Sequence, residues 1–167
     1  MSNRGRYLGS GIGLVDDKGR VAIPAPLRST LIANSPVSEG KGGGTIIIGA
    51  HQKERCLVAF DPGYLDRLAD DLDAREKAHP ADDGEFDYNI KRKGGLGAEA
   101  TPFDASGRFI MPGFPRFHAE IAGYAFFWGA VDTIEIWNPA ILFETPGIPA
   151  VMVSACRYHL AEKKVVL

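Results

Sequence analysis

The 167-residue sequence predicts an α+β, mainly β fold that is built from two tandem copies of one small unit, with helices packed around it. Three observations lead to this prediction: an internal repeat, short apolar segments separated by turn residues, and two amphipathic helical segments outside the repeats. A chain of this length can bury one good core or the cores of two small halves. A single hairpin cannot bury its apolar face alone, so we expect the two copies to interleave their hairpins into one small barrel.

The repeat is the most informative feature of the sequence. Residues 13–28 and residues 101–116 share an aspartate, a glycine, an arginine, a proline and a second arginine in one register, each displaced by 88 residues. The copies also share a second half, because residues 56–65 align with residues 133–142. The offset shrinks there because the first copy has a longer glycine-rich loop, and loops absorb such insertions at low cost. Five matches at fixed spacing are improbable by chance, so one structural unit is used twice.

Each copy begins with a predicted β-hairpin. In the first copy, residues 12–15 form a short strand, and the next four residues form a turn in which Gly19 is free to take a positive φ. Asp16 is placed to accept hydrogen bonds from the amides of its own turn. Residues 20–23 then return as the partner strand. The second copy repeats this arrangement 88 residues later.

A short helix and two more strands complete each copy. Pro24 ends the second strand of the hairpin, and Pro26 suits the first turn of a helix that runs to about residue 33. Further strands are predicted around residues 45–49 and 56–60. The order within each copy is therefore β-β-α-β-β. In the second copy Pro115 stands inside the short helix, where we expect it to distort the backbone.

Two helices are predicted outside the repeats. Residues 62–78 carry apolar side chains at helical spacing on an acidic background, and residues 151–164 form a second amphipathic segment. Residues 79–96 are predicted to be a connector of weak structure. The expected organisation is a first repeat with its acidic helix at residues 7–78, a connector at 79–97, a second repeat at 98–144 and a C-terminal helix at 145–167.

Charge is unevenly distributed along the chain. The formal net charge is −2, but residues 1–60 hold eight Lys and Arg against four Asp and Glu, whereas residues 61–88 hold ten acids against three bases. Phosphate groups respond to the local surface rather than to the net charge, so an acidic segment placed away from DNA leaves a basic surface intact. A solvated acidic helix on an ordinary protein explains the same pattern. Charge alone therefore leaves a nucleic-acid partner open.

Several classes of protein are disfavoured. The sequence has no run of 18 apolar residues and no secretory signal, and Cys56 and Cys156 lack the spacing of a CxxC motif, so we expect a cytoplasmic protein with buried thiols and no membrane partner. The motifs GxSxG, HExxH and GxxxxGK[ST] do not occur, and the four histidines lie far apart. We therefore expect no enzyme, no metal site and no cofactor.

With both copies laid out, the sequence resembles the MraZ family, regulators associated with bacterial division and cell-wall gene clusters. The residues that carry the resemblance are Asp16, Gly19, Arg20, Pro24 and Arg28, their counterparts Asp104, Gly107, Arg108, Pro112 and Arg116, and the closing Ile134-Glu135-Ile136-Trp137. The resemblance covers roughly residues 7–144. It implies an AbrB-like swapped-hairpin (double-split) β-barrel, a ring-shaped homo-oligomer, and binding to short direct repeats of double-stranded DNA upstream of the protein's own operon.

The resemblance also implies which residues bind DNA. In the wider class the arginine of the hairpin and the arginine of the following helix contact DNA, which points to Arg20, Arg28, Arg108 and Arg116. Lys18, at the tip of the first turn, is interpreted as a phosphate contact. The turn-orienting residues are Asp16, Gly19, Asp104 and Gly107. The expected function is a transcriptional regulator, as a repressor, located in the cytoplasm and associated with the nucleoid.

Two alternatives remain open from the sequence. Arg20 and Arg108 are also explained as exposed strand residues that only pair with Asp16 and Asp104, although a planar donor presented twice on similar hairpins suits phosphate oxygens and guanine edges. Both interpretations hold together if the aspartate orients the arginine. The alternative function is an antitoxin-like module of the same fold class, whose tail holds a toxin. Such tails are extended, whereas the C-terminal segment here is predicted to be helical, which favours the regulator.

Overall fold

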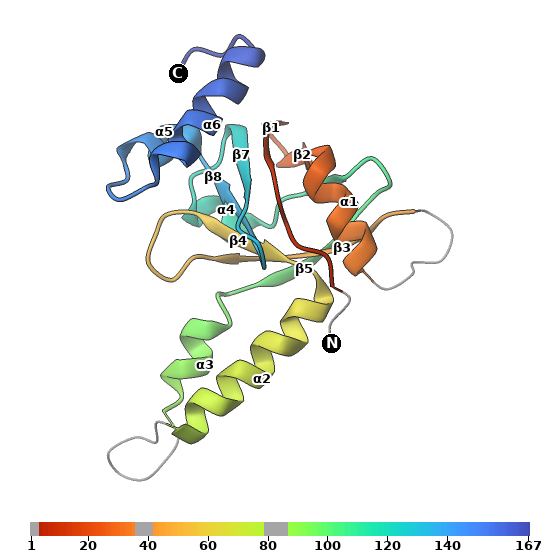
Figure 1. Cartoon of the computed structure of the whole chain (residues 1–167), viewed down its shortest axis with the longest axis vertical. Coiled ribbons are helices and arrows are strands. Elements are labelled where there is room, and N and C mark those ends of the chain that lie inside the picture. Colours follow the sequence, from red (N-terminus) through yellow and green to blue (C-terminus); the bar gives the residue numbers. More distant parts are fainter. Residues whose placement is uncertain (1–3, 36–41, 79–86) are drawn as a thin grey trace.

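The computed structural model describes residues 4–35, 42–78 and 87–167. In this part of the chain, strands and helices follow the predicted β-β-α-β-β order twice, which confirms the α+β class (Figure 1). The strands are β1 (Ser10–Val15), β2 (Arg20–Ala22), β3 (Gly44–Ala50), β4 (Leu57–Phe60), β5 (Glu99–Phe103), β6 (Arg108–Ile110), β7 (Gly123–Gly129) and β8 (Ile134–Trp137). The helices are α1 (Ala25–Asn34), α2 (Pro62–Ala78), α3 (Asn89–Gly94), α4 (Gly113–His118), α5 (Pro139–Glu144) and α6 (Ala150–Glu162).

Six strands form one curled sheet in the order β1-β7-β8-β4-β3-β5, and every neighbouring pair is antiparallel. The hairpins β3–β4 and β7–β8 meet at its centre, where Val58 lies opposite Glu135, its counterpart in the other repeat. β1 pairs with β7 and β5 pairs with β3, so the first strand of each repeat extends the hairpin of the other. The order reads the same from either end when the repeats are exchanged, which gives the chain an internal two-fold symmetry.

The predicted hairpin between residues 12–15 and 20–23 is wrong in its pairing. The turn is closed as expected, because the amide of Gly19 donates to the carbonyl of Asp16 at 3.0 Å. Beyond the turn, however, β2 pairs with β6, and Val21 lies opposite Phe109, its counterpart in the second repeat. Both side chains are buried in the main core, so the two short strands cover that core together at the symmetry axis. Local periodicity predicts such strands but cannot identify a partner 88 residues away.

The core has two parts on the two faces of the sheet. One part lies between the sheet, the β2–β6 ribbon and α1, and includes Leu27, Leu31 and Phe127. The other part lies beneath α5 and α6, and includes Phe126 and Trp137. Neighbouring residues of β7 thus point to opposite faces, as strand geometry requires. In Figure 1, α5 and α6 gather near one end of the sheet, and α6 packs against β1.

The acidic helix is confirmed, but the expectation of weak structure after it is wrong for residues 89–94. Residues 89–94 of that segment form α3, which lies along α2 and projects with it from the sheet (Figure 1). Lys91 of α3 pairs with Asp73 at 2.7 Å and with Glu76 at 3.1 Å, and Leu72 packs against Gly94. These contacts stabilise a helix that is too short to be stable alone. Residues 79–86 of the predicted connector lie outside the described residues.

The expected distortion by Pro115 does not occur. This proline is the third residue of α4, within the first turn, where an amide would have no partner inside the helix. The helix closes normally, and the amide of Arg116 donates to the carbonyl of Pro112 at 3.1 Å. Arg116 is therefore presented from a regular turn. Within the described residues, no helix combines the length and the apolar character needed to cross a membrane.

Candidate nucleic-acid interface

The first repeated turn fixes an arginine through an aspartate. Oδ1 of Asp16 accepts hydrogen bonds from the amides of Lys18 at 3.0 Å and Arg20 at 2.8 Å. Oδ2 of the same carboxylate accepts from Nε of Arg20 at 2.6 Å. Gly19 adopts a φ of +84°, a conformation that favours glycine. One carboxylate therefore shapes the turn and orients the guanidinium at the same time.

The second turn has the same geometry. Oδ1 of Asp104 accepts from the amides of Ser106 and Arg108 at 2.9 Å each, and Oδ2 accepts from Nε of Arg108 at 2.8 Å. Gly107 has a φ of +81°. The predicted pairing of each hairpin arginine with its aspartate is therefore present in both repeats. Because all three hydrogen bonds recur, the two turns are the same structural motif.

Hydrogen bonding keeps both aspartates ionised. The backbone amide of Arg20, and then its side chain, lower the pKa of Asp16 below its ordinary value. The pKa of Asp104 is lowered in the same way, first by the backbone amide of Arg108. Each carboxylate therefore stays negative at neutral pH. Each guanidinium engages its aspartate through Nε, and the Arg20 and Arg108 side chains are 60% and 72% exposed. Their two terminal NH₂ groups thus face solvent.

The β2–β6 ribbon places the two arginines on one face. Arg20 lies opposite Ile110 and Ala22 lies opposite Arg108, while Val21 and Phe109 point inward. Since residues directly opposite each other in an antiparallel pair share a face, both guanidinium groups project outward from one narrow ribbon. A two-stranded ribbon of this kind fits the major groove of B-DNA.

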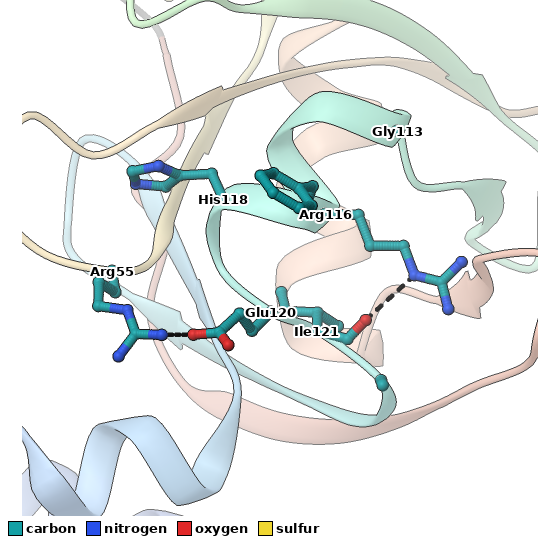
Figure 2. Close-up of a pocket in the computed structure, with 8 residues that line it drawn as sticks. Arg55, Gly113, Arg116, His118, Glu120 and Ile121 are labelled. Atoms are coloured by element: carbon teal, nitrogen blue, oxygen red, sulfur yellow. Dashed lines mark hydrogen bonds and ion pairs between the residues drawn. The ribbon is translucent and has the colours of Figure 1, made fainter.

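The two helix arginines hold the turns of the opposite repeats. Nη1 of Arg28, on α1, donates to the carbonyl of Ser106 at 2.8 Å. Arg116, on α4, donates through Nη1 and Nη2 to the carbonyls of Asp17 and Asp16, at 3.3 Å each. Its Nε donates to the carbonyl of Ile121 at 3.0 Å (Figure 2). The sequence does not reveal this exchange, because the turn carbonyls that accept from Arg28 and Arg116 lie 78 to 100 residues away along the chain.

The turn glycines leave room for these arginines. A Cβ atom on Gly107 would lie 2.9 Å from Cδ of Arg28, and a Cβ atom on Gly19 would lie 3.2 Å from Nη1 of Arg116. The glycines therefore serve both the backbone conformation and the close approach of the opposite helix. With Lys18 exposed at the tip of the first turn, all five predicted DNA-binding residues lie on the ribbon, its turns or the helices that hold them.

A hollow of about 700 Å³ lies beside α4, and Arg116, His118 and Glu120 are among the residues that line it. An ion pair between Arg55 and Glu120 closes one side (Figure 2). In the same view the guanidinium of Arg116 points away from the other labelled side chains.

The N-terminal arginines occupy places that the sequence did not predict. Nη2 of Arg4 donates to the buried carboxylate of Asp61 at 2.6 Å. The hydroxyl of Tyr7 donates to the same carboxylate at 2.7 Å, and Arg6 pairs with Asp132. This segment is therefore bound to the folded core of the protein. The sequence signal at Asp61 is a local one: an aspartate directly before Pro62 is typical of the start of a helix, and its carboxylate accepts from the amide of Tyr64 at 3.1 Å.

Both cysteines are buried, as predicted. Burial raises the pKa of the Cys156 thiol to about 12, and burial likewise raises the pKa of the Cys56 thiol. Both side chains are therefore thiols rather than reactive thiolates at neutral pH. Among the described residues, no group of three or more histidine, cysteine or acidic side chains is arranged to hold a metal ion.

Comparison with known proteins gives consistent relatives, although no family model matches the sequence. The transcriptional regulator MraZ of Ruegeria pomeroyi is 33% identical over 138 residues, which cover 81% of this chain and 78% of that protein. The regulator of the same name from Roseiflexus castenholzii is 31% identical over 133 residues, covering 80% of this chain and 81% of the relative. That of Rhodospirillum rubrum is 28% identical over 142 residues, or 84% of each chain.

Proposed function

Because this chain belongs to the MraZ family, we propose that it is a transcriptional regulator that binds double-stranded DNA through the β2–β6 ribbon and its two turns. The observation that carries the proposal is the pair of arginines, Arg20 and Arg108, each oriented by its own aspartate and both exposed on one ribbon. The relatives support the role of transcriptional regulator, and the exposed arginines of the ribbon support this surface as the place where DNA binds.

The geometry suits recognition of guanine or phosphate. An arginine that is already held through Nε loses little further freedom when its two terminal NH₂ groups bind the O6 and N7 atoms of guanine or a phosphate. Lys18 is a compact charge that suits the phosphate beside the ribbon. Arg28 uses one nitrogen to hold the second turn, so we assign it a phosphate contact as well. Arg116 donates from all three of its nitrogens to backbone carbonyls, and we assign it to holding the first turn.

The acidic part of the chain lies far from this surface. Figure 1 places α2 and α3 at the end of the molecule opposite β2. The negative charge of α2 therefore does not face a duplex that is bound at the ribbon. The exchange of β1 and β5 between the repeats, together with the β2–β6 pairing, supports assignment to the AbrB-like swapped-hairpin class.

For the assembly, we propose a ring-shaped homo-oligomer that binds direct repeats upstream of its own operon and represses the division and cell-wall gene cluster. One ribbon contacts few base pairs, whereas linking several ribbons raises avidity by roughly 10²–10⁴ when the geometry fits. Head-to-tail protomers repeat with one polarity, which matches boxes in direct orientation about one helical turn apart. Exposed Phe114 and Phe117 on α4 offer apolar surface for such contacts. The corresponding location is the cytoplasm, in association with the nucleoid.

The antitoxin alternative is less well supported. It expects an extended C-terminal tail that is free to hold a partner, but α6 packs on the sheet and buries Met152, Cys156 and Leu160. A segment that is held in this way is not available to wrap around a toxin without first leaving its own core.

The direct test is binding of full-length variants to the DNA upstream of the protein's own gene. We expect Arg20→Ala and Arg108→Ala each to weaken binding about 5- to 150-fold if the arginine reads a base. Arg92→Ala is the matched control, because it removes an exposed arginine from α3, far from the ribbon. Circular dichroism checks that each variant is folded. A folded double variant that binds like the Arg92→Ala protein would refute the assignment of the site.

A further inference from the structure

The exposed face of the ribbon is not uniformly polar. Ile110, directly opposite Arg20, is 59% exposed, and Leu14 on the adjacent β1 is 64% exposed. With exposed Ala22, opposite Arg108, these side chains line a hollow of about 330 Å³ between the two arginines. We call Leu14, Ala22 and Ile110 the apolar strip. It lies within the surface to which the proposed function assigns DNA.

We propose that the apolar strip reads thymine methyl groups in the major groove, with Ile110 as the specificity-determining residue; this inference rests on the proposed function. Thymine alone among the four bases presents an apolar group in the major groove, and aliphatic side chains are its usual contact there. Arginine alone distinguishes guanine but gives no preference for thymine over cytosine at a neighbouring position. The strip supplies that missing preference.

The spacing of the ribbon matches that of stacked bases. Directly opposite residues of an antiparallel pair have Cβ atoms about 4.5–5.5 Å apart, whereas successive base pairs are about 3.4 Å apart. When Arg20 contacts a guanine, Ile110 therefore lies over the adjacent base pair or the one after it. The expected reading is a guanine with a thymine one or two steps away.

Charge makes DNA a better occupant of the strip than a second copy of the chain. Arg20 and Arg108 flank the strip, and both are largely exposed. The same face of a second copy would bring two more guanidinium groups against them, and such like-charge contact is unfavourable. The major groove presents guanine acceptors to the arginines and thymine methyl groups to the strip in one surface.

The internal symmetry provides a matched control. Ala22 is the counterpart of Ile110, so the two halves of the ribbon carry the same arginine beside different apolar side chains. Ile110→Ala therefore places alanine beside Arg20, as Ala22 already stands beside Arg108. Ala22→Ile makes the reverse change, and we expect it to add sensitivity to a methyl group beside Arg108.

The experiment uses the tightest-binding duplex selected from a random-sequence library, with each thymine replaced in turn by deoxyuridine, which lacks only the methyl group. We expect one replacement near the Arg20 half of a box to weaken wild-type binding about fourfold. Ile110→Ala should lose the same factor on the thymine duplex and become indifferent to that replacement.

Three outcomes would overturn the inference. If the wild-type protein binds the selected duplex but tolerates every replacement equally, no methyl group is read. If Ile110→Ala keeps the full response, another residue reads the methyl group. If Ile110→Ala changes the mass of the assembly in light scattering and not the response to deoxyuridine, the strip is an interface between copies. Failure to select any duplex would instead refute the proposed function itself.

Discussion

Replacing the two helix arginines by alanine should have opposite consequences: Arg116→Ala should lower stability more, and Arg28→Ala should weaken phosphate binding more. Arg116→Ala removes three hydrogen bonds to backbone carbonyls, at 3.0, 3.3 and 3.3 Å, whereas Arg28→Ala removes one at 2.8 Å. A net contribution of about 0.5–1.5 kcal/mol for each bond, with the longer bonds at the weak end, gives about 1.5–3 kcal/mol for Arg116 and about 1 kcal/mol for Arg28. In a chain of this size this corresponds to a decrease in Tm of roughly 3–12 °C and 2–4 °C, respectively.

Their effects on DNA binding should run the other way. If Arg28 also contacts a phosphate, its removal should reduce the slope of log affinity against log salt by about 0.9, whereas removal of Arg116 should leave that slope unchanged. Guanidinium chloride unfolding measures the first quantity, and fluorescence anisotropy over a salt series measures the second. Equal stability losses, or a larger change of slope for Arg116→Ala, would refute this division of roles.

Two further predictions concern stability. Asp61→Ala removes the buried partner of Arg4 and should cost about 3–5 kcal/mol in urea unfolding. Burial alone would raise the pKa of Asp61, but hydrogen bonds from Arg4 and its other partners lower this pKa overall. The stabilisation by Asp61 is therefore complete above the ordinary pKa of an aspartate and is lost as the pH falls through the lowered value. Unfolding at a series of acidic pH values should show this loss in the wild type and less of it in the variant. Gly107→Ala should cost more than Gly147→Ala in thermal unfolding, because both glycines have positive φ but only the first would place its Cβ against Arg28; equal losses would show that the close approach is unimportant.

The sequence predicts the elements of the repeats well because their signals are local. The turn residues, the prolines and the alternation of apolar side chains each act within a few positions, and the pairing of Arg20 with Asp16 spans only one turn. The helix over residues 62–78 has the same local basis.

The errors and the contacts that the sequence did not predict share one physical cause, which is that long-range partners leave little trace in a single sequence. β2 pairs with β6, and Arg4 donates a hydrogen bond to Asp61, which lies 57 residues away. α3 is stabilised by ion pairs with α2 rather than by its own sequence. The bonds of Arg116 to the first turn belong to the same class, so its role in holding that turn follows only from the structure.

Recognition of a specific DNA sequence by the β2–β6 ribbon can be measured directly. The most direct measurement compares the affinity of the full-length protein for the DNA upstream of its own gene with that for a shuffled duplex of equal length and composition, at physiological salt. We expect the upstream DNA to bind about 10³-fold tighter or more, and we expect this ratio to collapse when Arg20 and Arg108 are both replaced by alanine. Equal affinity of the wild-type protein for the two duplexes would contradict the claim.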